Sequence, residues 1–371
     1  MVSPPMRHPA TESLGRLRDE LFRTAVACDS SHAIDLVLRA LEAAGGCDGD
    51  ILAGRAAAET ILLNVIAPVQ ARVGTEWAAN RITVAQEHGA SAISDRCISA
   101  LIGEVRRRPH ERSRGRIIVA CVEGEWHALP ARLLAETLIL RGWEVDYLGA
   151  QVPTPHLVAH IQQRNADAVL LSSSIPTRLP AAHAAISACQ SVGMPVLVGG
   201  AAFGADGRYA RLLGAEGWAP DAPAAADALA DGLTPRTEAP GLLGLDTLPH
   251  LSDQEYTFVI TNKQVLARQV IADLERDFPA MRAYTDAQRE RTAEDVDHIV
   301  EFLSVALYVD DHDLFTVFIG WTREILVARR VPAASMIPAL DSLARQLHDF
   351  PRALGLLAAG RSALTAPPAP R

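Results

Sequence analysis

The sequence contains few cysteines, few aromatic residues and no excess of positive charge. Its five cysteines are scattered without a C-x-x-C pair, which excludes a disulfide scaffold and a zinc site of the usual spacing. Only 5% of the residues are aromatic, and alanine and leucine are common instead, which favours helices over an all-β sandwich. A net charge of −9 excludes a protein built mainly to grip phosphate backbones, and no arginine-rich recognition helix is evident.

Targeting signals are also lacking. The opening residues, MVSPPMRHPATES, contain no apolar core of the kind that a signal peptide needs. No run approaches the roughly 20 apolar residues of a membrane span. We therefore expect a cytoplasmic protein with no membrane contact and no direct nucleic-acid partner. At 49% hydrophobic and 21% charged residues, a chain of 371 residues should bury two or three cores.

Hydrophobic spacing divides the chain into segments of a multidomain protein with α and α/β parts. Residues 13–107 place apolar residues at three- and four-residue steps, which predicts a bundle of helices. Residues 116–233 alternate short apolar strands with helices, which predicts a doubly wound, Rossmann-like parallel sheet. Residues 234–251 are rich in Pro and Gly and predict a linker, and 252–365 predict an all-helical domain of globin-like length.

Two long helices are expected within the helical segments. The spacing predicts one helix over Trp77–Ile102, with a second half that could start at 81–83, and another helix over Gln254–Phe278. The basic run 106–116 is interpreted as a polar hinge between domains, and the last six residues as a disordered tail.

The loop after the first predicted strand carries a candidate metal ligand. A histidine at the carboxyl edge of a parallel sheet, His127, can project its imidazole out of the fold. Glu125, two residues earlier, can accept the other ring N–H and so fix the tautomer. Taken alone, this Glu-x-His pattern is more typical of an ordinary loop histidine.

Small residues follow the third and fourth predicted strands. Ser172 and Ser174 lie at the end of one strand, and Gly199 and Gly200 at the end of the next. Small side chains at both places leave a slot between the sheet and its helices, and glycine allows close approach of the backbone. A flat heterocycle on a long tail could enter such a slot.

Together these three motifs resemble the cobalamin-binding domains of methionine synthase and the corrinoid mutases, which carry Asp-x-His-x-x-Gly, then Ser-x-Leu, then Gly-Gly. This chain has Glu125-x-His127-x-x-Pro130, Ser172-x-Ser174 and Gly199-Gly200 at similar spacing. The resemblance implies that His127 ligates the lower face of cobalt and that the serines and glycines line the slot of the nucleotide tail. Three positions depart from the pattern, namely Glu125, Pro130 and Ser174; glutamate is typical of the light-sensing branch.

The helical segment carries a second resemblance. Trp77, nine residues and then Glu87-His88 are similar to the signature of B12-dependent photoreceptors. In that family the bundle caps the upper face of adenosylcobalamin, with the tryptophan over the adenosyl group and the Glu-His pair in contact with it. The alternative is that Trp77 is simply a core aromatic residue. The family's histidine directly after the tryptophan is replaced by Ala78, so that position cannot ligate cobalt after photolysis.

The domain order resembles photocobilins, in which a cobalamin domain is fused to a globin-like domain that binds biliverdin. The third segment offers five candidates for a pigment pocket: His298, Asp310, His312, Trp321 and Arg323. For each of them singly, a surface, capping or core role is the alternative. Because no cysteine lies beyond Cys189, a bilin here would be bound non-covalently. Haem with an axial histidine is the competing ligand.

These features predict a light sensor more than an enzyme. Light would cleave the Co–C bond, the bundle would shift, and the change would reach the last domain, an oligomer interface of a homodimer or a downstream signalling protein. The DNA-reading domain of the transcriptional photoreceptors has no counterpart, because about a dozen residues precede the first helix. Two alternatives stay open: a methyl-carrying corrinoid protein of a methyltransferase system, and a cobalamin sensor that does not respond to light.

Overall fold

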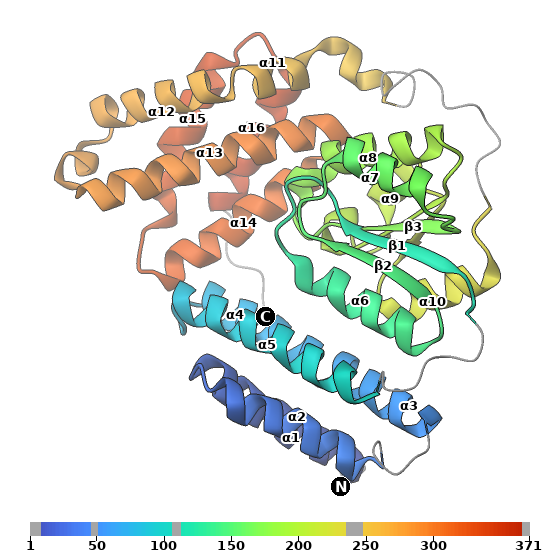
Figure 1. Ribbon diagram of the computed structural model, residues 1–371. Helices are drawn as coiled ribbons and strands as arrows, with labels where there is room; N and C mark the ends of the chain where they lie inside the picture. The colour runs from blue at the N-terminus through green and yellow to red at the C-terminus, as the bar shows by residue number, and fades with distance from the viewer. Residues whose placement is uncertain (1–8, 46–50, 106–112, 235–247, 366–371) are drawn as a thin grey trace, which may run out of the picture.

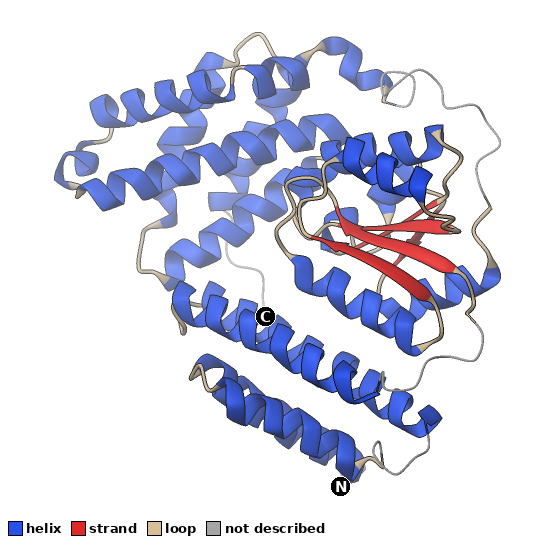
Figure 2. Ribbon diagram, in the orientation of Figure 1, coloured by secondary structure: helices blue, strands red, loops and turns tan. Residues whose placement is uncertain are grey.

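Helices from both ends of the chain flank a central parallel sheet in the computed structural model (Figure 1 and Figure 2). The structure describes residues 9–45, 51–105, 113–234 and 248–365. Most of the two predicted linkers and the predicted tail lie outside these residues. The predicted fold class is confirmed, with a helical bundle, a Rossmann-like domain and an all-α region in this order.

The N-terminal bundle has one core of its own. Its helices are α1 (Pro9–Val26), α2 (Ser30–Ala43), α3 (Ile51–Ile61), α4 (Ala67–Ala78) and α5 (Val84–Val105), and a π-helical turn (Leu62–Ile66) joins α3 to α4 without a break. By length and composition, the stretch 51–78 could span a membrane. No other helix among the described residues meets these criteria. The inward residues of the stretch 51–78, among them Leu62 and Val73, are fully buried in the bundle core. Its apolar character is therefore used for helix packing.

The helix predicted over 77–102 is interrupted, which corrects that expectation. Trp77 lies near the end of α4, and α5 begins only at Val84. Asn80 adopts a left-handed conformation, with φ of 56°, and ends the first helix. Thr83 and Gln86 then form a capping box, in which the Gln86 N–H donates to Thr83 Oγ1 and the Thr83 N–H donates to Gln86 Oε1. Trp77 and Glu87 therefore lie on two antiparallel helices.

The central sheet has the strand order β2-β1-β3-β4-β5, all parallel. The strands are β1 (Arg116–Cys121), β2 (Glu144–Gly149), β3 (Ala168–Ser172), β4 (Val196–Gly199) and β5 (Gly217–Ala219). Their side chains are apolar on both faces because helices cover both, as expected for a parallel sheet. Helices α7 (Thr154–Gln163), α8 (Leu179–Ser191) and α9 (Arg208–Leu212) lie on one face, and α6 (Ala128–Leu140) and α10 (Ala222–Asp231) on the other (Figure 1).

The C-terminal region is all helical. Its longer elements are α11 (Glu255–Thr261), α12 (Lys263–Asp277), α13 (Asp286–Val309), α14 (His312–Ala328), α15 (Ile337–Gln346) and α16 (Pro351–Thr365). The single helix predicted over 254–278 is two helices that meet at Asn262, so this expectation is also corrected. Helices α13 and α14 form a hairpin, because only Asp310 and Asp311 separate them.

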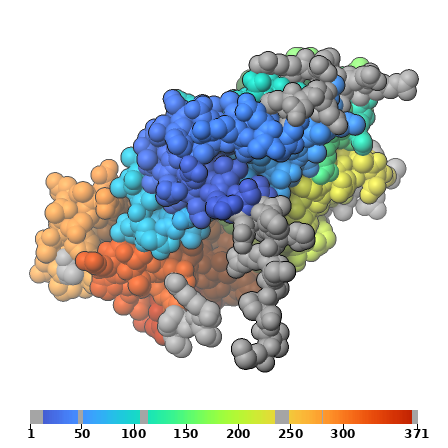
Figure 3. All heavy atoms as spheres, turned by 90° about the horizontal axis from the view of Figure 1, so that it is seen from below, coloured from blue at the N-terminus to red at the C-terminus, as the bar shows by residue number. Residues whose placement is uncertain are grey.

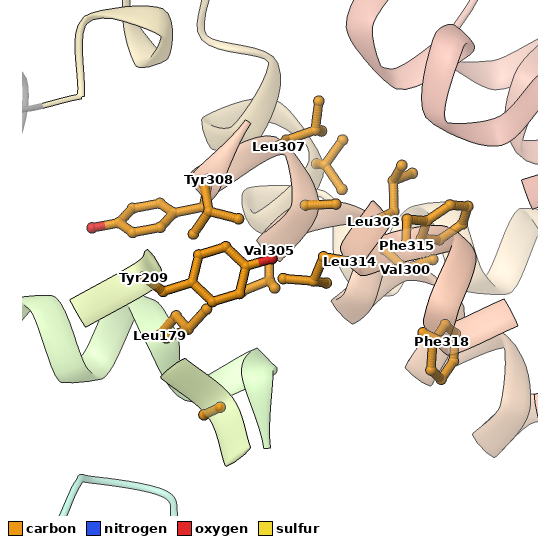
Figure 4. Packing of buried hydrophobic residues seen from close by; sticks show 14 of the residues in the cluster. Leu179, Tyr209, Val300, Leu303, Val305, Leu307, Tyr308, Leu314, Phe315 and Phe318 are labelled. Atoms are coloured by element: carbon orange, nitrogen blue, oxygen red, sulfur yellow. The ribbon is translucent and has the colours of Figure 1, made fainter. Parts of the chain in front are cut away.

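The C-terminal region and the sheet share one hydrophobic core. Leu179 and Tyr209 of the sheet domain point toward Val305, Tyr308 and Leu314 of the α13–α14 hairpin (Figure 4). At this contact the buried His183 bonds through Nδ1 to the Tyr308 hydroxyl at 2.7 Å, and the Tyr209 hydroxyl donates to Asp311 Oδ2 at 2.8 Å. Burial lowers the pKa of His183 and raises that of Tyr308, so both groups are neutral where they meet. The two domains therefore form one packed body.

The bundle is joined to this body more loosely. Seen from below, it covers one face of the molecule, and its cyan end abuts the orange helices (Figure 3). Among the described residues of the sheet domain, α6 alone extends its core, with Leu133 and Leu140 buried in it and Leu129 packed against it. An ion pair between Glu59 of α3 and Arg141 closes this contact at 2.7 Å.

Candidate functional site

The loop between β1 and α6 presents one histidine to solvent. His127 is the N-cap residue of α6, and its side chain is 55% exposed, while the Glu125 side chain behind it is 1% exposed. Glu125 Oε1 accepts the backbone N–H of His127 at 2.8 Å and the ring Nδ1–H at 2.6 Å. Because Nδ1 carries the proton in this pairing, the Nε2 lone pair is free to bind a metal ion. The sequence prediction of Glu125 as the partner of His127 matches this geometry.

Glu125 is held as a carboxylate by donors from two loops. Its second oxygen, Oε2, accepts the N–H groups of Ser174 at 2.6 Å and Ile175 at 3.2 Å, and the Ser173 hydroxyl at 3.3 Å. Burial raises the pKa of Glu125, but the hydrogen bonds from His127 and Ser174 outweigh this effect and bring the pKa to about 2. The hydrogen bond to this carboxylate in turn raises the pKa of His127, which makes the imidazole a stronger base and a better ligand.

The predicted slot lies at the carboxyl ends of β3 and β4. Ser172 pairs with Gly199 on one side and with Cys121, at the end of β1, on the other. At Gly200, φ is 100°, and an added Cβ would lie 2.2 Å from the carbonyl oxygen of Ser173. The backbone of Gly200 therefore lies so close to the backbone of Ser173 that only glycine fits at position 200.

Ser174 has a different role from the predicted one. The prediction placed Ser174 in the wall of the slot, but its backbone N–H donates a hydrogen bond to the Glu125 carboxylate. Ser173, which the sequence reasoning passed over, donates to the same carboxylate. The run of three serines at 172–174 was the signal in the sequence for this contact. The run alone does not show which serine donates to Glu125.

We expect Gly200→Ala to destabilise the protein by about 2–3 kcal/mol, because the added methyl group combines a strained φ with a clash against Ser173. Urea unfolding at neutral pH measures this loss. Gly232→Ala is the matched control, since Gly232 also has a positive φ, of 88°, but no atom lies within 4 Å of its added Cβ. The control should lose about 1 kcal/mol. Equal losses in both variants would show that backbone strain alone acts at Gly200.

A cavity of about 350 Å³ adjoins the His127 loop at the end of β2. It is lined by Leu148, Ala150, Gln151, Val152, Pro153, His156 and His160. The backbone N–H of Gln151 donates to the Glu125 carbonyl at 3.0 Å, so the cavity and the loop are connected. The side-chain Nε2 of Gln151 is buried and has no partner in the described protein. A ligand with amide oxygens at its rim would supply that partner.

The bundle brings its own candidates to the same side of the molecule. Glu87 and His88 lie in the first turn of α5, where Glu87 contacts the ring Nδ1 of His88 and accepts the Ser91 hydroxyl at 2.9 Å. The negative charge of Glu87 also helps to raise the pKa of His127, after the larger effect of Glu125. Glu87 is therefore close enough to act on the His127 imidazole across the space between the two domains.

One further exposed aromatic residue lies in the loop that carries His127. Trp126, between Glu125 and His127, is 75% exposed, which is unusual for a side chain of its size. The sequence reasoning did not select it, although its place between the two functional residues was visible.

The five C-terminal candidates divide into two groups. Asp310 and His312 lie at the turn of the α13–α14 hairpin, where Asp310 forms an ion pair with Arg352 at 2.9 Å. His298, Trp321 and Arg323 lie about three helical turns away from that turn, on facing stretches of the two helices. Of these three, Trp321 is 49% exposed, and Arg323 donates to the Ala363 carbonyl at 3.1 Å. A single ligand at one place would meet one group or the other.

Comparison with known proteins agrees with the geometry of the first two domains. The profile of a B12 binding domain matches residues 115–227, and a second B12 binding domain profile matches 17–102. The HTH-type transcriptional repressor CarA of Myxococcus xanthus is 27% identical over 207 residues, which is 54% of this chain. This chain spans 62% of the length of that repressor.

Two solved structures share parts of the fold. The monomethylamine corrinoid protein of Methanosarcina barkeri is 20% identical and superposes with a TM-score of 0.47, over 57% of this chain and 96% of its own. A cobalamin-binding protein of Desulfitobacterium hafniense is 18% identical, with a TM-score of 0.31, over 57% of this chain and 95% of its own. Because both TM-scores are below 0.5, the fold is assigned from the strand order of this chain and not from these two structures. The profile match to residues 115–227 shows that the chain contains a cobalamin-binding domain, and His127 lies at the carboxyl edge of the sheet of this domain.

Proposed function

We propose that this chain, which carries a cobalamin-binding domain preceded by a helical B12-binding bundle, is a light sensor that binds adenosylcobalamin. The observation that carries the proposal is the His127 imidazole, whose Nδ1 bonds a buried carboxylate while its Nε2 is left free on a half-exposed ring. Adenosylcobalamin would supply a cobalt ion that can bind the His127 imidazole and a Co–C bond that light cleaves.

The fit of the cofactor is supported by three features of the sheet domain. His127 offers one nitrogen ligand, and Glu125 holds the proton on the other nitrogen. Gly199 and Gly200 put no side chain at the carboxyl end of β4, where a long tail could enter. The unpartnered Gln151 amide suits the carboxamide groups around a corrin ring.

The upper side of the proposed site belongs to the bundle. Glu87 acts electrostatically on His127, so the start of α5 lies across the space from the lower ligand. Trp77 lies on the neighbouring helix α4, close to the turn that leads to α5. In the proposed sensor Trp77 covers the adenosyl group, and the pair Glu87 and His88 contacts it. Loss of that group would leave Trp77 without its packing partner, and the bundle would shift.

The second pigment proposed for the C-terminal region is a non-covalently bound bilin. His298 and Trp321 are the better candidates, because Asp310 already has an arginine partner and Arg323 already donates to the Ala363 carbonyl. A half-exposed tryptophan suits packing against an open tetrapyrrole. The output would be a change in a homodimer or in a downstream protein, and the match to a transcriptional repressor supports a regulatory role.

The test is spectroscopic. The full chain is purified in the dark with adenosylcobalamin and biliverdin, its absorbance is recorded, and it is then illuminated with green light. We expect the cobalamin bands to change on illumination and a red-absorbing band to report the bilin. Trp77→Ala should speed the loss of the adenosyl group, and Trp143→Ala, a partly buried tryptophan of the sheet domain, is the control. Unchanged cobalamin bands under green light would refute the photosensor, and a Soret band in place of the red band would assign haem.

A further inference from the structure

The bundle is fixed to the rest of the described protein chiefly along α6, which contacts α3, α5 and the π-helical turn. There Leu133 and Leu140 of α6 enter the bundle core, and Glu59 accepts hydrogen bonds from Arg141 at 2.7 and 3.2 Å. Glu59 and Trp77 belong to the same continuous helical stretch, and about 27 Å of helix separates them. Motion of the bundle about α6 would therefore be largest near Trp77.

At the far end, Trp77 meets a cation from the C-terminal region. The guanidinium carbon of Arg329 lies 5.6 Å from the centre of the Trp77 ring, within the range of a cation–π contact. Arg329 is the C-cap residue of α14, and its backbone N–H donates to the carbonyls of Ile325 and Leu326, both at 3.1 Å. These bonds fix the point from which the long side chain reaches toward the bundle.

Helix α14 is itself anchored to the cobalamin-binding domain. Asp311, its N-cap, accepts the Tyr209 hydroxyl at 2.8 Å and pairs with Arg208 at 3.1 Å. Phe315 and Ile319 of α14 belong to the core that the two domains share. Arg329 thus stands on the body that contains His127, while Trp77 stands on the part that can pivot.

We propose that Arg329 is a positioning residue that holds Trp77 over the upper face of the cofactor and connects this cap to the C-terminal domain. The inference rests on the proposed function, because it takes Trp77 as the cap. An exposed cation–π contact is weak, so it holds the indole in the dark and gives way when the packing beneath the indole is lost. The same event would release the end of α14 and carry the signal into the C-terminal helices.

The test uses the full chain loaded in the dark with adenosylcobalamin, and it measures how fast the cofactor dissociates after dilution, from the absorbance of the protein-bound fraction. Arg329→Gln should speed dissociation roughly two- to fivefold, the size of an exposed cation–π contact. Arg329→Lys keeps the cation and should restore most of the slow rate. Arg330→Gln removes the same charge one residue away and should match the parent protein.

Two comparisons separate positioning from a general structural effect. In a Trp77→Ala background, Arg329→Gln should change nothing further, because the ring that it contacts is gone. With hydroxocobalamin, which has no bulky upper group for Trp77 to cover, the variant should also behave like the parent. The inference is overturned if Arg329→Gln has no effect, or if it acts equally in the Trp77→Ala background, with hydroxocobalamin or in the form of Arg330→Gln. Every measurement is made in the dark, so failure of the light response would leave this test unaffected.

Discussion

His127→Ala should abolish histidine ligation of cobalamin and weaken its affinity by about 100-fold or more. Loss of an outer partner of a metal ligand alone costs roughly 10- to 100-fold, and this change removes the ligand itself. The side chain is 55% exposed, so the fold should survive and the effect should be confined to binding. Absorbance titration with hydroxocobalamin measures both the affinity and the histidine-ligated spectrum.

Two controls make this result specific. His348→Ala removes an exposed histidine of the C-terminal domain, paired only with its neighbour Asp349 and the Arg345 carbonyl in the described structure, and should leave the titration unchanged. Added imidazole should restore a nitrogen-ligated spectrum in the His127→Ala protein, because the space beside Glu125 stays open to solvent. A histidine-ligated spectrum in the variant without added imidazole would refute the ligand assignment.

Glu125→Gln should weaken cobalamin binding about 10- to 100-fold, because the ring Nδ1–H of His127 loses its charged acceptor. It should also lower the free energy of unfolding at pH 7 by about 2–3 kcal/mol, since an amide NH₂ would face the N–H groups that now donate to Glu125 Oε2. Urea unfolding and the cobalamin titration measure the two effects. Glu123→Gln, an exposed neighbour in the same loop, is the control and should change neither.

The same carboxylate predicts how stability depends on pH. Its pKa is about 2 in the folded chain against a usual value of 4.5, so protons bind the unfolded chain more readily. The stabilisation is therefore complete above about pH 4.5 and is lost as the pH falls toward 2, by about 3 kcal/mol in total. Glu125→Gln should flatten this acid limb of the stability curve. An unchanged limb in the variant would place its origin in other carboxylates.

The helices and strands could mostly be predicted because each depends on the spacing of apolar residues within its own short segment. The alternation of strands and helices predicted over 116–233 is present as five parallel strands, since a buried parallel strand must be a short apolar run between helices. The sequence signal for the helix break before Val84 is the capping box of Thr83 and Gln86. The apolar residues on both sides of it keep a helical spacing, so the break could not be predicted with the rest. The split at Asn262 has no Pro or Gly to mark it, and helical propensity continues across it.

The site could be predicted in part for a similar reason. Glu125 and His127 are two residues apart, so their hydrogen bond follows from the loop alone. Ser173 reaches the same carboxylate from the loop after β3, and Arg329 reaches Trp77 from another domain. Such contacts depend on how separate elements pack, which residue spacing does not encode. The division of the C-terminal candidates into two groups likewise follows from the hairpin and not from their order.

The π-helical turn at Leu62–Ile66 determines which way the two ends of one helix face. Its Ala67 N–H donates to the Leu62 carbonyl, five residues back, so the turn holds one residue more than an α-helix would. One residue corresponds to about 100° of rotation about the helix axis. Glu59 before the turn can therefore face α6 while Trp77 beyond it faces α14, although both belong to a single unbroken rod. The direction in which Trp77 points relative to Glu59 is therefore set by one extra residue in the middle of the bundle.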